Sequence, residues 1–306
     1  MGDYAIETCG LRKTFPGDVV AVNGLGLQVE RGSVYGLIGR NGAGKTTTLR
    51  LLMGLLRPSS GTARVLGADL LTASADVRAN VAYVSQIQQI HSWMTAEELC
   101  HYLSYFYGGW DQTYARALAD RFRLPWDRQV GLLSGGEQRK VAVLLAFAAR
   151  PKVLILDEPA AGLDPIARRE LVTEIVEVIS SGDECTVLFS THIISDLERV
   201  ADHVGIMDQG KMVMSARIED LQSKTKRVQV IFEKEPPPGF AVPGAVHTST
   251  WGPVITAVAR IDDKSQLDEV RKIPGVRINL FPLGLEDIFI DLFGRDAQGE
   301  FRETRQ

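Results

Sequence analysis

The segment Gly39–Thr47, with the sequence GRNGAGKTT, restricts the possible folds of this chain more than any other feature. It fits the pattern G-x-x-x-x-G-K-[ST] and lies between an apolar run, SVYGLIG, and a run of helical character, TTTLRLLMGLL. Glycines let the backbone wrap closely around an anion, and the first turn of the following helix offers unpaired N–H groups. The segment therefore predicts a strand, a phosphate-binding loop and a helix in direct succession.

The residue types in this loop have separate physical tasks. Lys45 is expected to reach the β- and γ-phosphates of a nucleotide, and the Thr46 hydroxyl is expected to bind Mg²⁺. A glycine-rich turn can also be only a tight connection, but the spacing and the flanking elements argue against that. The loop residues that we predict to bind the nucleotide are Asn41, Gly42, Ala43, Gly44, Lys45, Thr46 and Thr47.

Short apolar runs alternate with helical segments through most of the chain, at 33–39, 152–159, 186–192 and 203–210. Continuous apolar runs suit strands that are covered on both faces, as in a parallel sheet. Near the N-terminus, Tyr4–Thr8 and Leu25–Gly32 lack an intervening helix and are expected to form an antiparallel addition. Together these patterns predict a layered α/β core.

Two acidic residues follow the apolar run VLIL. Asp157 and Glu158 are expected at the carboxyl end of a strand, where α/β sheets place their ligands. We expect Asp157 to hold Mg²⁺ through water and Glu158 to accept a proton from the attacking water. Two adjacent acids can also simply open a loop, but the phosphate-binding loop earlier in the chain favours the chemical role.

A second glycine motif, LSGGEQ at Leu133–Gln138, stands just ahead of another helical run. Free N–H groups and the helix dipole favour an anion there as well. In this position the motif resembles the signature of ATP-binding cassette (ABC) ATPases. The resemblance covers about Tyr4 to Ala216 and implies ATP as the nucleotide, with Mg²⁺ as its cofactor.

Further motifs follow in the order of that family. Gln86 in AYVSQ matches the glutamine loop, which contacts Mg²⁺ and senses the transmembrane partner, and His192 in FSTH matches the switch histidine at the γ-phosphate. Asp164 in AAGLD matches the loop that crosses to the other subunit, and Phe15 in TFPG stands where an aromatic ring stacks on adenine. Taken alone, each would suggest a solvated, structural or core residue. The resemblance implies that hydrolysis is carried by Lys45, Gln86, Glu158 and His192.

The fold class that follows is α/β: a P-loop NTPase core with an antiparallel β subdomain and a helical insertion, plus a small C-terminal α+β domain. We expect the ABC ATPase domain over 1–221, its helical subdomain at about 87–150, and an accessory domain over 222–306. The segment 87–128 is rich in aromatic residues, among them Trp93, Tyr105 and Phe106. They either pack in a core or form a docking surface for a partner.

The resemblance also implies a head-to-tail dimer with a second identical or related ATPase subunit. Each ATP then lies between the phosphate-binding loop of one subunit and Ser134, Gly135 and Gly136 of the other. The family commonly has hydroxyl residues after the proline of DEP and before GLD, where this chain has Ala160 and Ala161. A hydroxyl that could bond across the dimer is therefore missing.

The longest apolar run, Val141–Ala149, is far shorter than the roughly 20 residues of a membrane-spanning helix. We therefore expect a cytoplasmic chain, held at the inner face of the cell membrane by transmembrane permease subunits. The tail FPLGLEDIFIDLFG is similar to the SLEDIF ending of cassette subunits from bacterial exporters, with Gly284 in place of the serine. The net charge of −4 gives no reason to expect a nucleic-acid partner.

Two alternative functions belong to other classes. Soluble ABC ATPases act on ribosomes or DNA, but those usually carry two cassettes or a long coiled coil, and this chain has one cassette without sustained heptads. An unrelated kinase or GTPase is disfavoured by the signature motif, and the sequence contains no N-K-x-D guanine motif.

Overall fold

The computed structural model describes residues 4–86, 90–181 and 185–293 of the chain. It divides into two compact units, Met1–Ser215 and Ala216–Gln306. Each unit has its own sheets and its own hydrophobic core.

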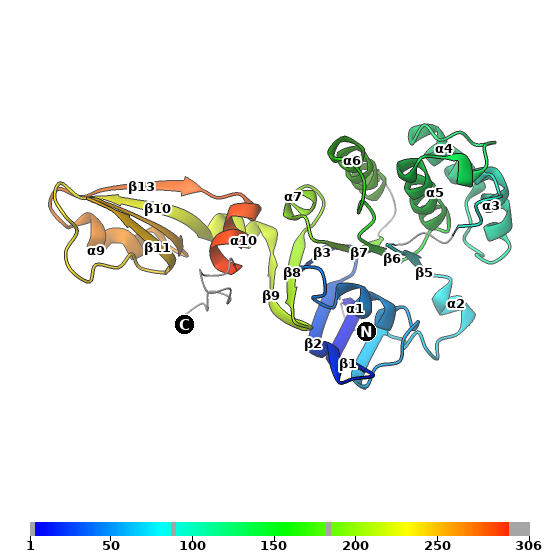
Figure 1. The fold of residues 1–306 in the computed structure, drawn as a ribbon, viewed down its shortest axis with the longest axis horizontal. Helices are drawn as coiled ribbons and strands as arrows, with labels where there is room; N and C mark the ends of the chain where they lie inside the picture. The colour runs from blue at the N-terminus through cyan, green and yellow to red at the C-terminus, as the bar shows by residue number, and fades with distance from the viewer. Residues whose placement is uncertain (1–3, 87–89, 182–184, 294–306) are drawn as a thin grey trace. The chain divides into compact units, whose positions relative to one another are not determined.

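A six-stranded sheet forms the centre of the first unit. Its strands lie in the order β5 (Val81–Val84), β6 (Val153–Asp157), β7 (Thr186–Thr191), β3 (Val34–Ile38), β8 (His203–Asp208) and β9 (Lys211–Arg217). The first five pair in parallel, and β3, β6 and β7 are buried along their whole length. The predicted parallel core is confirmed, because such strands are covered on both faces (Figure 1).

A smaller antiparallel sheet packs against one face of this core. It has the order β2 (Val19–Glu30), β1 (Tyr4–Phe15) and β4 (Ser60–Val65). Side chains of this sheet, of α1 (Lys45–Leu52) and of the central sheet share one cluster that includes Val22, Leu49 and Ile155. The α1 helix is therefore held between two sheets, directly after the phosphate-binding loop.

The opposite face of the central sheet carries most of the helices (Figure 1). They are α3 (Ala96–Ser104), α4 (Gln112–Arg121), the short η1 (Val130–Leu132), α5 (Gly135–Ala148), α6 (Pro165–Ser181) and α7 (Ile194–Leu197), whereas α2 (Ala75–Arg78) precedes β5. Polar caps explain where several of them begin: Thr95 and Ser134 form capping boxes with Glu98 and Glu137, and Asp111 caps α4.

Four aromatic residues of the helical insertion lie at the surface rather than in a core. Trp93, Tyr105 and Phe106 are 66%, 75% and 62% exposed, and Tyr102 lies beside them with 43% exposure. Their rings contact one another and nearby histidines at the surface, as in the edge-on pair of Tyr102 and Phe106 with centroids 5.2 Å apart. Core packing is therefore the wrong account of these four residues. The buried side chains of the insertion include Leu99 and Leu118 together with the aromatic Phe122.

The second unit is an antiparallel sheet with helices, as predicted for an α+β domain. The sheet has the order β11 (Ala245–Trp251), β12 (Val254–Arg260), β10 (Thr225–Ile231) and β13 (Arg277–Pro282). The helical segments are α8 (Ile218–Lys224), η2 (Lys264–Leu267), α9 (Asp268–Arg271) and α10 (Leu285–Phe293). Leu267 and Val270 pack on one side of the sheet, and Ile288 of α10 packs on Val258. No helix in the described part of the chain combines the length and the apolar character that crossing a membrane requires.

Candidate active site

The phosphate-binding loop joins β3 to α1. Gly44 has a φ of +101°, and a Cβ at this position would lie 2.3 Å from the Ala21 carbonyl oxygen, so only glycine fits. The Thr48 N–H donates to the Gly44 carbonyl over 2.9 Å, which makes Gly44 the cap of α1. The loop thus ends in a helix N-terminus, as an anion site requires.

Lys45 folds back over this loop. Its side chain is only 4% exposed, and its Nζ donates to the Gly39 carbonyl oxygen over 2.6 Å. The same ammonium forms an ion pair of 3.0 Å with Oε1 of Glu158. A buried charge needs such partners, because an unpaired charge in a low-dielectric interior is costly. The ion pair joins the loop to the end of β6.

Asp157 ends β6 and is completely buried. Its Oδ1 accepts hydrogen bonds from the Thr46 hydroxyl at 3.1 Å and the Ser190 hydroxyl at 2.8 Å. Its Oδ2 accepts a hydrogen bond from the Tyr83 hydroxyl at 3.2 Å. Burial, and then the charge of Asp157, raises the pKa of Tyr83 to about 12, so this hydroxyl stays a donor at neutral pH.

The Glu158 carboxylate lies between the Lys45 ammonium and the His192 imidazole. Its Oε1 faces Lys45, and its Oε2 lies 2.9 Å from Nδ1 of His192. Its backbone has a φ of +46°, and its N–H donates to both the carbonyl and the hydroxyl oxygen of Ser190, each at 3.1 Å. A buried carboxylate next to a partly exposed imidazole can accept a proton and share it with that ring.

The structure therefore brings five of the candidate residues together: Lys45, Thr46, Asp157, Glu158 and His192. They come from three segments far apart in the sequence. Parallel strands β3, β7 and β6 are neighbours, so the residues at their carboxyl ends meet at one edge of the sheet.

The signature segment begins α5. The Ser134 hydroxyl donates to Oε2 of Glu137 over 2.7 Å, and the Glu137 N–H donates back to the Ser134 oxygen over 3.3 Å. Hydrogen bonds from the Ser134 N–H and hydroxyl hold the pKa of Glu137 below its ordinary value. Gly135 is exposed, and a Cβ added to it would meet no atom within 4 Å. The start of this helix is therefore open on its outer side.

The remaining candidates have contacts of a different kind. Gln86 is exposed, and its carbonyl accepts a hydrogen bond from Arg139 of α5 over 3.3 Å. Asp164 caps α6 by accepting from the Ile166 N–H at 2.9 Å. Phe15 is half-buried at the end of β1, with the Lys13 ammonium 5.2 Å from its ring centroid. None of these contacts involves the five clustered side chains.

The residues around Asp157 suit a magnesium ion. A carboxylate and a hydroxyl, Asp157 and Thr46, already lie within hydrogen-bonding distance of each other at 3.1 Å. Magnesium prefers such hard oxygen ligands, and nucleotide enzymes complete its shell with phosphate oxygens and water. The donor set therefore fits this ion.

Three residues with direct contacts to the site were not among the sequence predictions: Tyr83, Ser190 and Arg139. Arg139 donates to the carbonyls of Gln86 and Pro159 at 3.3 and 3.2 Å. Tyr83 and Ser190 stand inside the motifs AYVSQ and FSTH, and Arg139 directly follows the motif LSGGEQ. The sequence therefore marked the regions in which these residues lie. It could not predict their hydrogen-bond partners, because those depend on which strands and helices become neighbours.

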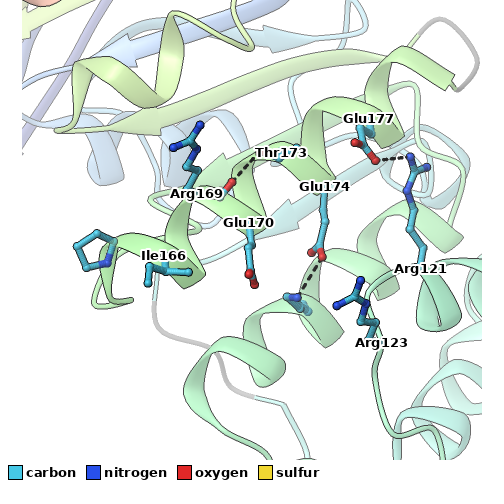
Figure 2. Close-up of a pocket in the computed structure, with 10 residues that line it drawn as sticks. Arg121, Arg123, Ile166, Arg169, Glu170, Thr173, Glu174 and Glu177 are labelled. Carbon is cyan, nitrogen blue, oxygen red and sulfur yellow. Dashed lines mark hydrogen bonds and ion pairs between the residues drawn. The ribbon is translucent and has the colours of Figure 1, made fainter.

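A second charged region joins the helical insertion to the core. Figure 2 shows a cleft between α6 and the segment from α4 to α5, with a volume of about 760 Å³. Lys140 pairs with Glu174 at 3.1 Å, and Arg121 pairs with Glu177 at 2.6 Å. Burial raises the pKa of Glu174. These two ion pairs connect α4 and α5 to α6.

Comparisons with known proteins agree with this geometry. Residues 22–161 match the ABC transporter family. The chain is 32% identical to the Nod factor export ATP-binding protein I of Burkholderia orbicola, over 92% of this chain and 95% of the relative. It is also 32% identical to the daunorubicin/doxorubicin resistance ATP-binding protein DrrA of Streptomyces peucetius, over 98% and 95%.

A solved structure described as the ATP binding subunit of an ABC transporter superposes with a TM-score of 0.63 at 29% identity. The match covers 72% of this chain and 92% of that one. With the phosphate-binding loop, the paired acids and the signature segment in one fold, this chain belongs to the ABC transporter family and is an ATP-binding, ATP-hydrolysing subunit.

Proposed function

We propose that this chain hydrolyses Mg-ATP as one half of a two-fold dimer and drives export through separate transmembrane subunits. The observation that carries the proposal is the contact of the buried Lys45 and Glu158 with the more exposed His192 at the end of β6, beside Asp157 and Thr46. This is the set that phosphoryl transfer to water requires: a cation for the phosphates, a base for the water and oxygen ligands for the metal.

The roles follow from the contacts. Lys45 exchanges its ion pair with Glu158 for the phosphate oxygens of ATP, which frees the carboxylate to accept the proton of the attacking water. His192 holds the other carboxylate oxygen and lies on the exposed side, where the γ-phosphate would arrive. Gln86 follows the carboxyl end of β5, and we propose that it takes part in hydrolysis together with the other three residues.

Thr46 and Asp157 would hold Mg²⁺ together with the phosphates, and Gln86 would approach the same ion. The ion neutralises charge that develops on the β- and γ-phosphates. Asn41, Gly42, Ala43 and Thr47 would contribute the loop backbone and a hydroxyl, and Phe15 would stack on the adenine ring.

The dimer is proposed because the signature segment is open where it faces outward. Ser134, Gly135 and Gly136 start α5 with exposed or half-exposed backbone, and Asp164 stands at the exposed start of α6. In a two-fold assembly the partner's ATP would meet these N–H groups and the positive end of the helix dipole. Hydrolysis would then remove the phosphate that bridges the subunits.

A transmembrane permease is proposed to dock on the aromatic surface of the helical insertion, which we define as His91, Trp93, Tyr102, Tyr105 and Phe106. Large exposed aromatic groups gathered in one place are typical of interface cores. Such docking would hold the protein at the inner face of the cell membrane. Export, rather than import, is supported by the names of the relatives and by the tail motif LEDIF. We assign 1–221 to the ATPase and 222–306 to an accessory domain, a division that falls within α8, a few residues after the boundary between the two compact units.

Two measurements test the proposal. The purified chain should hydrolyse ATP only with a divalent metal, and pull-down in mild detergent should recover a polytopic membrane protein. Replacing Trp93 and Tyr105 by Ala should abolish that recovery without lowering basal hydrolysis. Trp251→Ala is the matched control, because Trp251 is 85% exposed but lies in the other unit. Recovery of ribosomes instead would favour the soluble class of ABC ATPases.

A further inference from the structure

The orientation of the Asp157 carboxylate depends on hydroxyl groups from three different elements. Thr46 of α1 and Ser190 of β7 both donate to Oδ1, at 3.1 and 2.8 Å. Tyr83 of β5 donates to Oδ2 at 3.2 Å. In the part of the chain that the structure describes, Tyr83 is the hydrogen-bond donor to Oδ2. Loss of its hydroxyl would leave that oxygen without a donor.

The register of the sheet explains why Tyr83 reaches Asp157. Tyr83 pairs with Ile155 in the parallel ladder of β5 and β6. Side chains of a strand alternate between faces, so Asp157, two residues beyond Ile155, lies on the same face as Tyr83. The tyrosine side chain is long enough to reach across these two residues of the neighbouring strand.

A carboxylate with donors on only one oxygen is poorly oriented. The terminal torsion of aspartate is broad, so bonds to Oδ1 alone leave the carboxylate plane free to turn about that oxygen. A second bond, to Oδ2 from the opposite side, fixes the plane. Because Asp157 is completely buried, each oxygen also needs a partner to compensate for lost water.

We propose that Tyr83 is a positioning residue for the metal site: its hydroxyl fixes the plane of the Asp157 carboxylate so that the carboxylate can serve the magnesium ion of bound ATP. The proposal rests on the proposed function, in which Asp157 and Thr46 hold that ion. In this role Tyr83 acts through its hydrogen bond to Asp157 and is not itself a ligand of the ion. Hydrogen-bond partners of metal-binding carboxylates commonly change metal affinity by about 10- to 100-fold when they are removed.

The test is the gain in nucleotide affinity that magnesium provides, measured without turnover. The Kd of the full chain for a non-hydrolysable ATP analogue is determined by calorimetry in excess EDTA and again in excess Mg²⁺. Tyr83→Phe keeps the ring and removes only the hydroxyl. Its Kd in EDTA should equal that of the wild type, whereas the gain from Mg²⁺ should shrink about 10-fold.

The activity gives a second readout. The Mg²⁺ concentration for half-maximal hydrolysis should rise by a similar factor in Tyr83→Phe, while the rate at saturating Mg²⁺ changes much less. Tyr107→Phe is the matched control, since Tyr107 is also half-buried and lines the same small groove as Tyr83. It should leave both readouts unchanged.

The outcomes separate the two proposals. An equal Mg²⁺-dependent gain in Tyr83→Phe and the wild type would overturn the positioning role while leaving the ATPase assignment intact. A wild type that gains no affinity from Mg²⁺ would overturn the metal site itself. A Tyr83→Phe protein that loses affinity equally with EDTA and with Mg²⁺ would show a general structural role and would also overturn the inference.

Discussion

Glu158 shows how a single residue is prepared for chemistry. Its left-handed backbone, with a φ of +46°, costs about 1 kcal/mol for a residue with a Cβ. Two hydrogen bonds from its N–H to Ser190 compensate, and the turn directs the carboxylate between Lys45 and His192. The strain therefore coincides with the proposed catalytic position.

Replacing the proposed base, Glu158, should separate binding from turnover. In Glu158→Gln the side chain keeps its shape but can no longer accept the proton, so the hydrolysis rate should fall by about 100-fold or more. ATP binding should persist, and an ATP-bound dimer should accumulate in size-exclusion chromatography. Glu170→Gln, on the exposed side of α6, should keep the wild-type rate. Normal turnover in Glu158→Gln would contradict the assignment of the base.

Lys45→Ala should act on binding itself. Removing the buried ammonium that we propose to contact the phosphate oxygens should weaken ATP affinity by about 10- to 100-fold. Equilibrium dialysis with labelled ATP measures the change, and Lys152→Ala, an exposed lysine ahead of β6, serves as the control. An unchanged affinity would contradict the proposal that Lys45 binds the phosphates of ATP.

At the scale of elements, α5 depends on its capping box. Ser134 and Glu137 satisfy N–H groups that would otherwise be unpaired at the start of the helix. Because Ser134 also belongs to the signature segment, the same bonds that stabilise α5 hold the backbone that the partner's ATP is proposed to meet. The proposed dimer thus links the stability of α5 to the function of the signature segment.

The capping box predicts a pH dependence with a definite sign. The folded state lowers the pKa of Glu137, so its ionised form stabilises the fold above the ordinary glutamate pKa. This contribution is lost as the pH falls through the lower, folded pKa. In urea unfolding at neutral pH, Glu137→Gln should be less stable than the wild type by about 0.5–1 kcal/mol, and the difference should shrink towards acidic pH.

Glu97→Gln provides the comparison for that experiment, since Glu97 is exposed in the first turn of α3 and its side chain takes no part in a capping box. It should show no such trend. A stability difference for Glu137→Gln that stayed constant across the acidic range would contradict the role of the ionised carboxylate.

At the scale of the whole molecule, the two units have separate cores, and α10 belongs to the second. Ile288 is completely buried against Val258 and Leu283, whereas Ile290 on the same helix is 58% exposed. The motif LEDIF that suggested an exporter thus also contributes a buried side chain to a small cluster of this unit.

Ile288→Ala should destabilise the second unit by about 2–5 kcal/mol, because it leaves a cavity. Differential scanning calorimetry of the full chain should show the change in one transition. Ile290→Ala should have little effect. Basal hydrolysis should be retained in both variants if 222–306 is accessory, and a loss of hydrolysis in Ile288→Ala would show that the ATPase depends on this unit.

The sequence was informative wherever a local pattern has one physical meaning. The glycine spacing before Lys45, the apolar runs and the acids after VLIL predicted the loop, the parallel core and the edge where ligands gather. It was ambiguous for Trp93, Tyr105 and Phe106, because an aromatic residue in a helical segment suits a core and an interface equally well. It missed Tyr83 and Ser190, whose meaning depends on an oxygen atom in another strand.

By itself, then, the sequence determined the order of elements, the class of ligand and the family, since each of these depends on residues close together in the chain. The tertiary structure decided which side chains share the Asp157 carboxylate and which aromatic rings remain at the surface. The reason is that strand order and register place β5, β6 and β7 side by side although long segments separate them in sequence. Hydrogen bonds act over a few ångströms in space, and only the folded sheet sets those distances.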